Sequence, residues 1–319
     1  DRARIMSRPF RLEPILELAE KEAEKSASRL GKLNVQKQQV ESKLNLLLRV
    51  LGRETSGYHG IETLFCRLDL ADELVVEQRD EPGRITLDTQ GVDLGPPERN
   101  LAYLAAERVL TATGARFGVH LTLAKRIPAG AGLGGGSANA AAALELVNQL
   151  AGNAVPRSEL FHFASRLGAD VPFLLSGASL ALGWGHGDRL LRLPSLPAAP
   201  VLLIMPPIPI RTPDAYQWVD AARGNVGSRG ALALDLDSVS RWSDVARMAG
   251  NDFESVVFGR EPRIRDAFDA LARTNPTLCR MTGSGSTLFA VYRTDRDRDD
   301  ARMMMGKKHG AVIATRTSG

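Results

Sequence analysis

The N-terminal part of the chain carries a repeating apolar pattern. Apolar or small residues alternate at spacings of four and three, at Leu12, Leu16, Ala19, Ala23, Ser26, Leu30, Leu33, Val40, Leu44 and Leu47. This spacing places one stripe along a helix and indicates a coiled coil. Lys37 interrupts the stripe and Ser26 weakens it, so a solvated amphipathic helix is the alternative. We therefore expect residues 1–40 to form a helical extension, whose residues 12–40 could bind a coiled-coil partner.

The pattern changes near residue 50. Short β-like runs at 73–78, 85–87 and 119–123 alternate with helical patterns at 100–113, 138–150 and 157–167. After a proline-rich stretch at 192–213, the apolar run 201–205 predicts a buried strand. Helices at 244–250 and 261–274, a strand at 286–292 and an exposed charged loop at 294–304 before a last helix complete the prediction. The mixture indicates an α+β chain with domains at 41–191 and 192–319.

Composition narrows the function classes. The chain has 319 residues, with 41 Lys+Arg against 37 Asp+Glu, a small excess that argues against a nucleic-acid partner. The longest apolar stretches, such as 201–209, are too short to cross a membrane. Two cysteines, Cys66 and Cys279, fit the reducing cytoplasm. The cysteines and five histidines have no metal-ligand spacing, so we expect no metal site built from them.

A glycine-rich segment is the most informative part of the sequence. Five glycines occupy the seven positions from Gly130 to Gly136, between a predicted strand and an alanine-rich helix. Glycine allows close backbone approach, and a helix N-terminus offers unpaired N–H groups to an anion. The segment therefore predicts a phosphate cradle, with Ser137 adding a hydroxyl; a flexible turn is the alternative. No Lys-Ser/Thr follows the glycines, so it is not a Walker A loop.

The segment PAGAGLGGGSANAA at 128–141 resembles the ATP-phosphate motif of the GHMP kinase superfamily. Further matches follow in family order: GYH at 57–59 with TLF at 63–65, LGADVPF at 167–173, NDFE at 251–254 and MTGSGSTLF at 281–289. The resemblance covers about residues 43–317. It implies an N-terminal domain like ribosomal protein S5 domain 2, a ferredoxin-like C-terminal domain, and a cleft between them for ATP and substrate.

The resemblance also assigns the residues that handle ATP. It implies that Asp170 is the general base on the substrate hydroxyl and that Lys43 pairs with it. Mg²⁺ is expected with ATP, and no protein ligand is assigned to it. The nucleotide contacts are implied to be Lys125 on the adenine side and, from the loop, Pro128, Gly130, Gly132, Leu133, Gly134, Gly135, Gly136, Ser137, Ala138 and Asn139. From the residues alone, Asp170 could instead be a helix-end carboxylate and Lys125 a solvated charge.

A second set of residues is implied to bind the substrate. The GLGGGS loop with Gly-Tyr-His resembles the branch acting on an alcohol linked to cytidine diphosphate (CDP) in non-mevalonate isoprenoid synthesis. The implied contacts are Asn45, Tyr58, His59, Asn100, Thr212 and Tyr216, with the base between Tyr58 and Tyr216, and Gly283, Ser284 and Gly285 closing over the phosphate loop. From the residues alone, Asn100 could simply cap the following helix, and His59 could be a solvated loop residue.

The two patterns overlap at residues 41–48. Residues 6–48 resemble the start of the flagellar export protein FliJ, a helical hairpin, and Glu41-Ser42 replaces the Pro-Ala that usually precedes the kinase lysine. Either residues 43–50 form the kinase's first strand, which Asn45 favours, or they continue the helix and Lys43 matches by chance.

We expect ATP-dependent phosphorylation of the 2-hydroxyl of the CDP-linked alcohol by a cytoplasmic monomer or homodimer. The alternatives are another GHMP kinase, of the homoserine or mevalonate type, and a coiled-coil interaction protein that carries an inactive kinase remnant.

Overall fold

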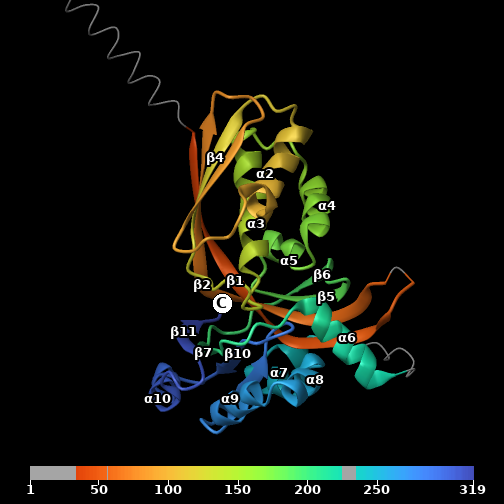
Figure 1. The fold of residues 1–319 in the computed structure, drawn as a ribbon, viewed down its shortest axis with the longest axis vertical. Coiled ribbons are helices and arrows are strands. Elements are labelled where there is room, and N and C mark those ends of the chain that lie inside the picture. The colour runs from red at the N-terminus through yellow and green to blue at the C-terminus, as the bar shows by residue number, and fades with distance from the viewer. Residues whose placement is uncertain (1–33, 56, 225–234) are drawn as a thin grey trace, which may run out of the picture.

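The computed structural model describes residues 34–55, 57–224 and 235–319. They form two stacked parts, each a sheet with helices (Figure 1). The first sheet contains β1 (Val35–Arg53), β2 (His59–Arg79), β3 (Ile85–Gln90), β4 (Gly118–Ala124), β5 (Leu180–Gly185), β6 (Arg189–Leu193) and β8 (Gly250–Asn251). The second contains β7 (Pro200–Met205), β9 (Leu278–Met281), β10 (Leu288–Val291) and β11 (Ala311–Arg316).

The first sheet has the order β3-β4-β2-β1-β8, with β5 pairing β2 and β6 pairing β5. One face is covered by α2 (Leu101–Ala112), α3 (Gly135–Leu150), α4 (Arg157–Leu167) and α5 (Val171–Ser176) (Figure 1). The short helix η1 (Pro97–Arg99) precedes α2. Helix α2 buries Ala102, Ala105, Ala106 and Val109, a helical spacing on one face. Facing alanines in α3 keep both helices slim, so the two pack closely against each other.

The second sheet is antiparallel in the order β11-β7-β10-β9. Its helices are α6 (Thr212–Arg223), α7 (Trp242–Met248), α8 (Phe253–Arg260), α9 (Pro262–Ala272) and α10 (Asp295–Met305), with η2 (Asp237–Val239) before α7. Strand β7 is buried throughout except at Met205, as its unbroken apolar run predicts. Two sheets, each with helices of its own, confirm the α+β fold class expected from the sequence.

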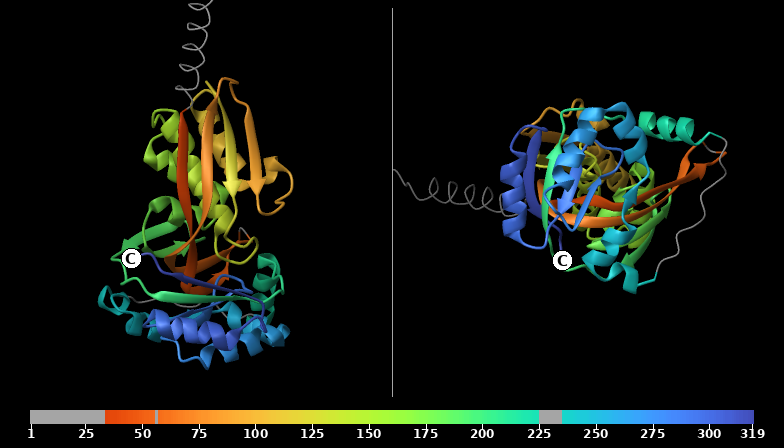
Figure 2. Two further views of the ribbon diagram at one scale, coloured as in Figure 1. Left: turned by 90° about the vertical axis from the view of Figure 1, so that its left-hand side faces the viewer. Right: turned by 90° about the horizontal axis from the view of Figure 1, so that it is seen from below.

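The two parts share a core. Strands β1 and β2 run from the upper part into the lower one (Figure 2), and a buried cluster joins Leu44, Leu46 and Leu64 of these strands to Leu203 and Phe289 of the second sheet. Strand β8 lies within the C-terminal part of the sequence but pairs in parallel with β1. The middle of β1 is therefore held at the junction, where its polar side chains can face both parts.

Residues 35–40 form strand, so the prediction that the helical extension reaches residue 40 is wrong there. The residues from Ser42 to Leu48 are all buried, because this central strand is covered on both faces. Leu44, Leu47 and their apolar neighbours satisfy a heptad stripe as well as a strand, which explains the ambiguity at 41–50. The first of the two possibilities holds: these residues are the first strand. Residues 1–33, with most of the FliJ-like segment, lie outside the described residues.

Two further boundaries differ from expectation. Helix α3 begins at Gly135 rather than at 138, so the last glycines belong to its first turn. The charged stretch expected as an exposed loop is helix α10, whose N-cap Thr294 accepts a hydrogen bond from Asp297 N at 3.1 Å. Asp295 and Asp297 lie in its first turn, where their negative charges interact favourably with the helix dipole. Among the described residues, no helix combines the length and apolar character that a bilayer crossing requires.

Candidate active site

A lysine and an aspartate meet at the junction of the two parts. Lys43, in β1, places Nζ 3.1 Å from Oδ2 of Asp170, and the lysine side chain is 3% exposed against 30% for the aspartate. Asp170 is the N-cap residue of α5, but its side chain makes no capping hydrogen bond. The carboxylate is therefore committed to the lysine rather than to the helix end.

Lys43 is held in place by a polar network. Its Nζ donates to Oδ1 of Asn45 at 2.6 Å, and Nδ2 of Asn45 donates to Oγ1 of Thr63 at 2.8 Å. The backbone N–H of Asn45 donates to Oγ1 of Thr282 at 3.1 Å. Thr63 in turn donates to Leu47 O at 2.7 Å. Asn45, expected to contact substrate, is buried and orients the lysine; Thr63 and Thr282 were not singled out for this role by the sequence.

The glycine-rich segment lines a pocket of about 320 Å³ beside this pair. Gly130, Gly132 and Gly134 have φ of 69°, 71° and 71°, a left-handed conformation that L side chains rarely adopt. A Cβ on Gly134 would lie 3.0 Å from Cγ of Lys43. The loop thus curves tightly over the lysine and leads into the N-terminus of α3, as a phosphate cradle requires.

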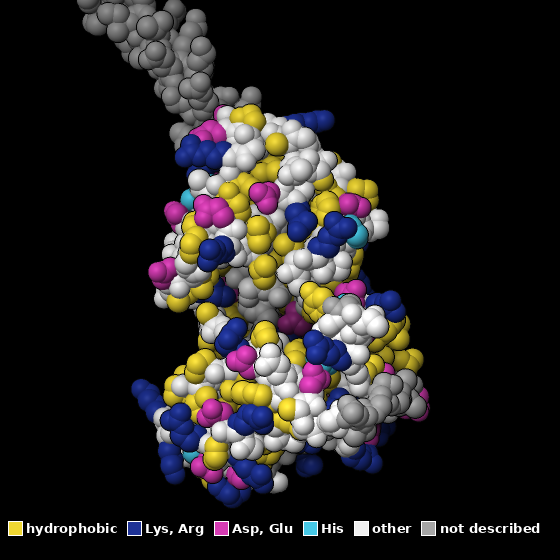
Figure 3. Space-filling view, turned by 45° about the vertical axis from the view of Figure 1, so that its right-hand side comes forward, with side chains coloured by type: hydrophobic (Ala, Val, Ile, Leu, Met, Phe, Trp, Pro, Cys, Tyr) yellow, Lys and Arg dark blue, Asp and Glu magenta, His cyan; other side chains and the backbone are white. Residues whose placement is uncertain are grey.

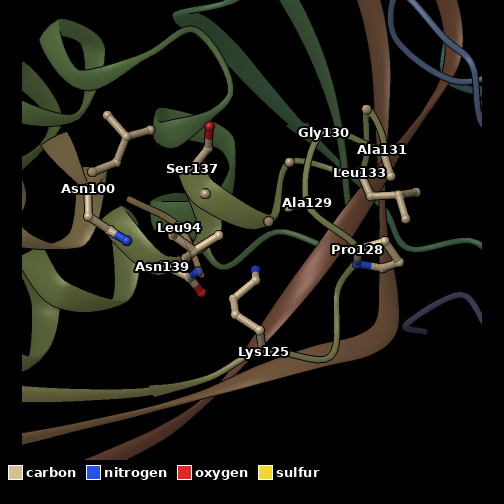
Figure 4. Close-up of a pocket in the computed structure, with 15 residues that line it drawn as sticks. Leu94, Asn100, Lys125, Pro128, Ala129, Gly130, Ala131, Leu133, Ser137 and Asn139 are labelled. Carbon is tan, nitrogen blue, oxygen red and sulfur yellow. The ribbon is translucent and has the colours of Figure 1, made fainter. Parts of the chain in front are cut away.

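Lys125 and Asn139 face the same pocket from opposite sides (Figure 4). Oδ1 of Asn139 is buried and has no hydrogen-bond partner among the described residues, so it can accept a hydrogen bond from a donor group of a bound ligand. A nucleotide base carries such donors, and its phosphates suit the glycine loop. Lys125 is paired with the buried Asp72, a residue that no motif in the sequence singles out.

A second cavity, of about 920 Å³, is lined by residues 165–169, which directly precede Asp170 in the chain. Its walls come from the strand ends around residue 58, the turn before Asp170 and helix α6. Of the predicted substrate residues, it brings together Tyr58, His59, Thr212 and Tyr216. Figure 3 shows the surface hollowed at the waist between the two parts.

The aromatic residues in this cavity pair differently from the expected sandwich. Tyr216 stacks on His59, with ring centroids 4.6 Å apart, whereas Tyr58 is 67% exposed and lies 5.3 Å from the ring of His186. Nε2 of His59 lies 2.7 Å from Oδ1 of Asp220. Burial, and then the charge of Asp170, raise the pKa of Tyr216 to about 12, so its phenol keeps its proton at neutral pH.

The C-terminal turn at 283–285 packs on the glycine loop, as expected. A Cβ on Gly132 would lie 3.0 Å from Thr282 O and 3.6 Å from Gly285 O. Nδ2 of Asn251 holds this turn by donating to Met281 O at 2.7 Å and Gly283 O at 2.8 Å. Ser284 joins this turn to the second cavity through Thr212, a lining residue whose Oγ1 lies 3.0 Å from Oγ of Ser284.

The two cavities adjoin at Ser137. This residue lines the glycine-loop pocket, and its Oγ lies 3.8 Å from the Cβ position of Gly168, which lines the second cavity. Asp170 follows two residues later, so a donor and an acceptor bound in the two cavities would meet at the Lys43–Asp170 pair.

Asn100 is placed away from the predicted substrate residues. It lines the glycine-loop pocket and caps α2, accepting a hydrogen bond from Ala102 N at 2.9 Å. The alternative reading of Asn100 as a helix cap is the observed one. Within residues 34–55, 57–224 and 235–319, no group of three or more His, Cys, Asp or Glu side chains gathers as a metal site.

The sequence matches known families on both sides of the junction. Residues 100–178 match the GHMP kinases N terminal domain, and residues 231–311 match the GHMP kinases C terminal domain. The chain is 36% identical over 274 residues to a 4-diphosphocytidyl-2-C-methyl-D-erythritol kinase of Geobacter sp. (strain M21), covering 86% of this chain and 95% of the relative. A relative of the same name from Chromobacterium violaceum is 36% identical over 279 residues, covering 86% and 92%.

Solved structures agree with these relatives. The crystal structure of a 4-(cytidine 5'-diphospho)-2C-methyl-D-erythritol kinase superposes with a TM-score of 0.74 and 33% identity, covering 89% of this chain and 100% of that one. L. major mevalonate kinase in complex with R-mevalonate superposes with a TM-score of 0.66 at 12% identity, covering 90% and 97%. The second likeness shows the fold alone.

Proposed function

The chain belongs to the GHMP kinases, in the family of 4-diphosphocytidyl-2-C-methyl-D-erythritol kinases, and we propose that it transfers the γ-phosphoryl group of ATP to the 2-hydroxyl of 4-diphosphocytidyl-2-C-methyl-D-erythritol. This reaction belongs to non-mevalonate isoprenoid precursor synthesis. The observation that carries the proposal is the Lys43–Asp170 ion pair, whose members are next to lining residues of two adjoining cavities, Gly134 and Ala169.

In this proposal Asp170 takes the proton from the attacking hydroxyl. A carboxylate oxygen within hydrogen-bond reach of a hydroxyl can accept its proton directly. The hydroxyl oxygen then bonds to the γ-phosphorus as the bond from that phosphorus to the β,γ-bridging oxygen breaks, and ADP leaves. The Lys43 ammonium stands beside the carboxylate, where it can orient the hydroxyl and offset negative charge on the phosphoryl group.

The glycine-loop pocket is the proposed ATP site. Its support is the set of left-handed glycines at the N-terminus of α3 and the unpartnered Oδ1 of Asn139, which suits the amino group of adenine. Mg²⁺ supplies charge neutralisation when bound with ATP, and it coordinates mainly phosphate oxygens and water. We assign it no protein ligand.

The larger cavity is the proposed site of the CDP-linked alcohol. Tyr58, His59 and Tyr216 give it stacking surfaces for a base, and the cavity's volume of about 920 Å³ is in the range of small-molecule sites. Entry of the cytosine between Tyr58 and Tyr216 would require the His59–Tyr216 stack to open. We place the enzyme in the cytoplasm as a monomer or homodimer.

The test offers ATP with each of three alcohols to the purified chain: the CDP-linked methylerythritol, homoserine and mevalonate. We expect ADP release and a new phosphomonoester, seen by ³¹P NMR, with the first alcohol only. Asp170→Asn is the matched inactive control. Turnover of homoserine or mevalonate alone would favour a sibling kinase, and no turnover of any alcohol would favour the interaction protein.

A further inference from the structure

Asp72 is a fully buried carboxylate in the middle of β2, beneath the glycine-loop pocket. The pairing of β2 with β4 ends at Glu73 opposite Ala124. Beyond that point the side chain of Asp72 continues the pairing, because its Oδ1 accepts hydrogen bonds from the backbone N–H groups of Arg126 at 2.7 Å and Ile127 at 2.8 Å. One carboxylate oxygen thus fixes the turn that leads into the glycine loop.

The other oxygen of Asp72 pairs with the Lys125 ammonium, whose side chain is only 6% exposed. This ammonium lies directly under the start of α3, because a Cβ on Gly135 would be 3.1 Å from Nζ. A positive charge at a helix N-terminus is unfavourable, and a buried ammonium without a counter-ion is more so. The negative charge of Asp72 offsets both of these costs, so the backbone amides of the loop remain available to bind phosphate.

We propose that Asp72 is a positioning residue for nucleotide binding that acts through Lys125, holding its ammonium at one point of the pocket wall. The proposal rests on the glycine-loop pocket being the ATP site. In it, Lys125 offers the nucleotide a directed hydrogen bond rather than a mobile charge. Asp72 touches neither ATP nor the reacting atoms.

The decisive variant is Asp72→Asn. The carboxamide oxygen can still accept from Arg126 and Ile127, so the turn is kept, while Lys125 loses its counter-ion. We expect the dissociation constant for ATP, measured by calorimetry, to rise about tenfold, with a matching rise in KM for ATP and an unchanged KM for the alcohol. Glu73→Gln is the matched control, since this neighbouring carboxylate also pairs with a lysine, Lys37, but at the surface; it should leave ATP affinity unchanged.

Lys125→Met and the double variant show whether Asp72 acts through the lysine. If it does, Asp72→Asn adds no further loss of ATP affinity in the Lys125→Met background. The double variant also carries no unpaired buried charge, so it decides the matter if Asp72→Asn alone fails to fold. Unchanged ATP affinity in Asp72→Asn, or an equal loss in both backgrounds, would overturn the proposal. A parent chain that binds no ATP would instead overturn the proposed function.

Discussion

Lys43 and Asp170 are far apart in the sequence, yet Nζ of the lysine lies 3.1 Å from Oδ2 of the aspartate. The lysine is buried in β1, and the aspartate opens α5. Because the lysine side chain also donates to Asn45 at 2.6 Å, its ammonium has a fixed direction toward the carboxylate. The pair is therefore in place before either substrate binds. Catalysis of phosphoryl transfer depends mainly on holding the reacting groups in the correct geometry, and a preformed pair provides this.

Asp170→Asn should lower kcat by a factor of about 10² to 10⁴, because the carboxamide cannot take the hydroxyl proton. Lys43→Met should lower kcat by a factor of about 10² or more through the loss of charge stabilisation. The measurement is steady-state ADP release with the CDP-linked alcohol. ATP binding, followed by calorimetry, should persist in Asp170→Asn.

Lys37→Met is the matched control for the lysine. It changes another lysine of β1, one whose side chain is 59% exposed and paired with Glu73 at the surface. Its kcat should equal that of the parent. A Lys43→Met variant that turned over at the parental rate would show that Lys43 matches the family motif by chance.

The parts of the site that lie in short contiguous motifs could be predicted from the sequence. In the glycine loop, around Asp170 and in the Gly-Tyr-His segment, a few neighbouring residues indicate a backbone conformation or a ligand-binding group. Asp72 lies in no such motif. Thr63 and Thr282 lie in motifs that do not show their role. All three roles arise from partners that only the fold brings near: Lys125 for Asp72, and Asn45 for the two threonines.

The helices and strands could likewise be predicted only where their own residues carry a clear pattern. Helix α4 follows from its helical periodicity and was predicted with its observed bounds, whereas strand β7 follows from an unbroken apolar run in a proline-rich stretch. Strand β1 was ambiguous because burial on both faces removes the alternation that identifies a strand. The short strands β5 and β6, with the sequence GWG at the end of β5, are defined by their pairing with β2 rather than by their own pattern.

Gly134→Ala tests how closely the glycine loop must approach Lys43. The residue has φ of 71°, and a Cβ would meet Cγ of Lys43 at 3.0 Å. Gly152→Ala is a matched control, because φ is 72° and nothing lies within 4 Å. Both variants should lose about 1–2 kcal/mol of stability from the left-handed backbone, measured by denaturant unfolding. Only Gly134→Ala should also lose most kinase activity; equal activity in the two would refute the steric argument.

Thr282→Val tests the link between the C-terminal turn and the catalytic pair. Valine has nearly the same shape but leaves the buried Asn45 N–H without its acceptor at 3.1 Å. We expect a cost of about 1–3 kcal/mol and a fall in kcat of about tenfold, because Asn45 can then shift away from Lys43. Thr282→Ser keeps the hydroxyl and should restore most of kcat. A serine variant as slow as the valine variant would mean that the methyl group, not the hydroxyl, matters.

Asp220→Asn tests whether the orientation of His59 helps to recognise the substrate. A carboxylate oxygen only accepts, so Oδ1 of Asp220, 2.7 Å from Nε2, favours a proton on Nε2. In the neutral imidazole, Nδ1 is then an acceptor. A carboxamide can donate to Nε2 and reverse this. We expect KM for the CDP-linked alcohol to rise about tenfold, with KM for ATP unchanged. Asp214→Asn, on the same helix and near Arg211 at the surface, is the control and should alter neither constant.

Tyr216 predicts a loss of stability at alkaline pH. Burial, with the nearby charge of Asp170, raises the pKa of Tyr216 to about 12 in the folded chain, whereas an unfolded tyrosine ionises near pH 10. Between these values the folded state binds the extra proton, so the free energy of unfolding falls as pH rises from 10 to 12. Burial likewise raises the pKa of Tyr292 to about 12 and raises the pKa of Tyr103 and of the Cys66 thiol, so these groups add to the fall.

Tyr216→Phe removes one of these contributions. The free energy of unfolding, measured in denaturant at pH 8 and pH 11, should fall less in this variant than in the parent, by roughly 1 kcal/mol. The ring that stacks on His59 remains in the variant, so the comparison isolates the phenol proton from the packing of the aromatic ring. An identical fall in both proteins would mean that the Tyr216 phenol is solvated in the folded chain, and that the walls of the substrate cavity are looser around α6 than the His59–Tyr216 stack indicates.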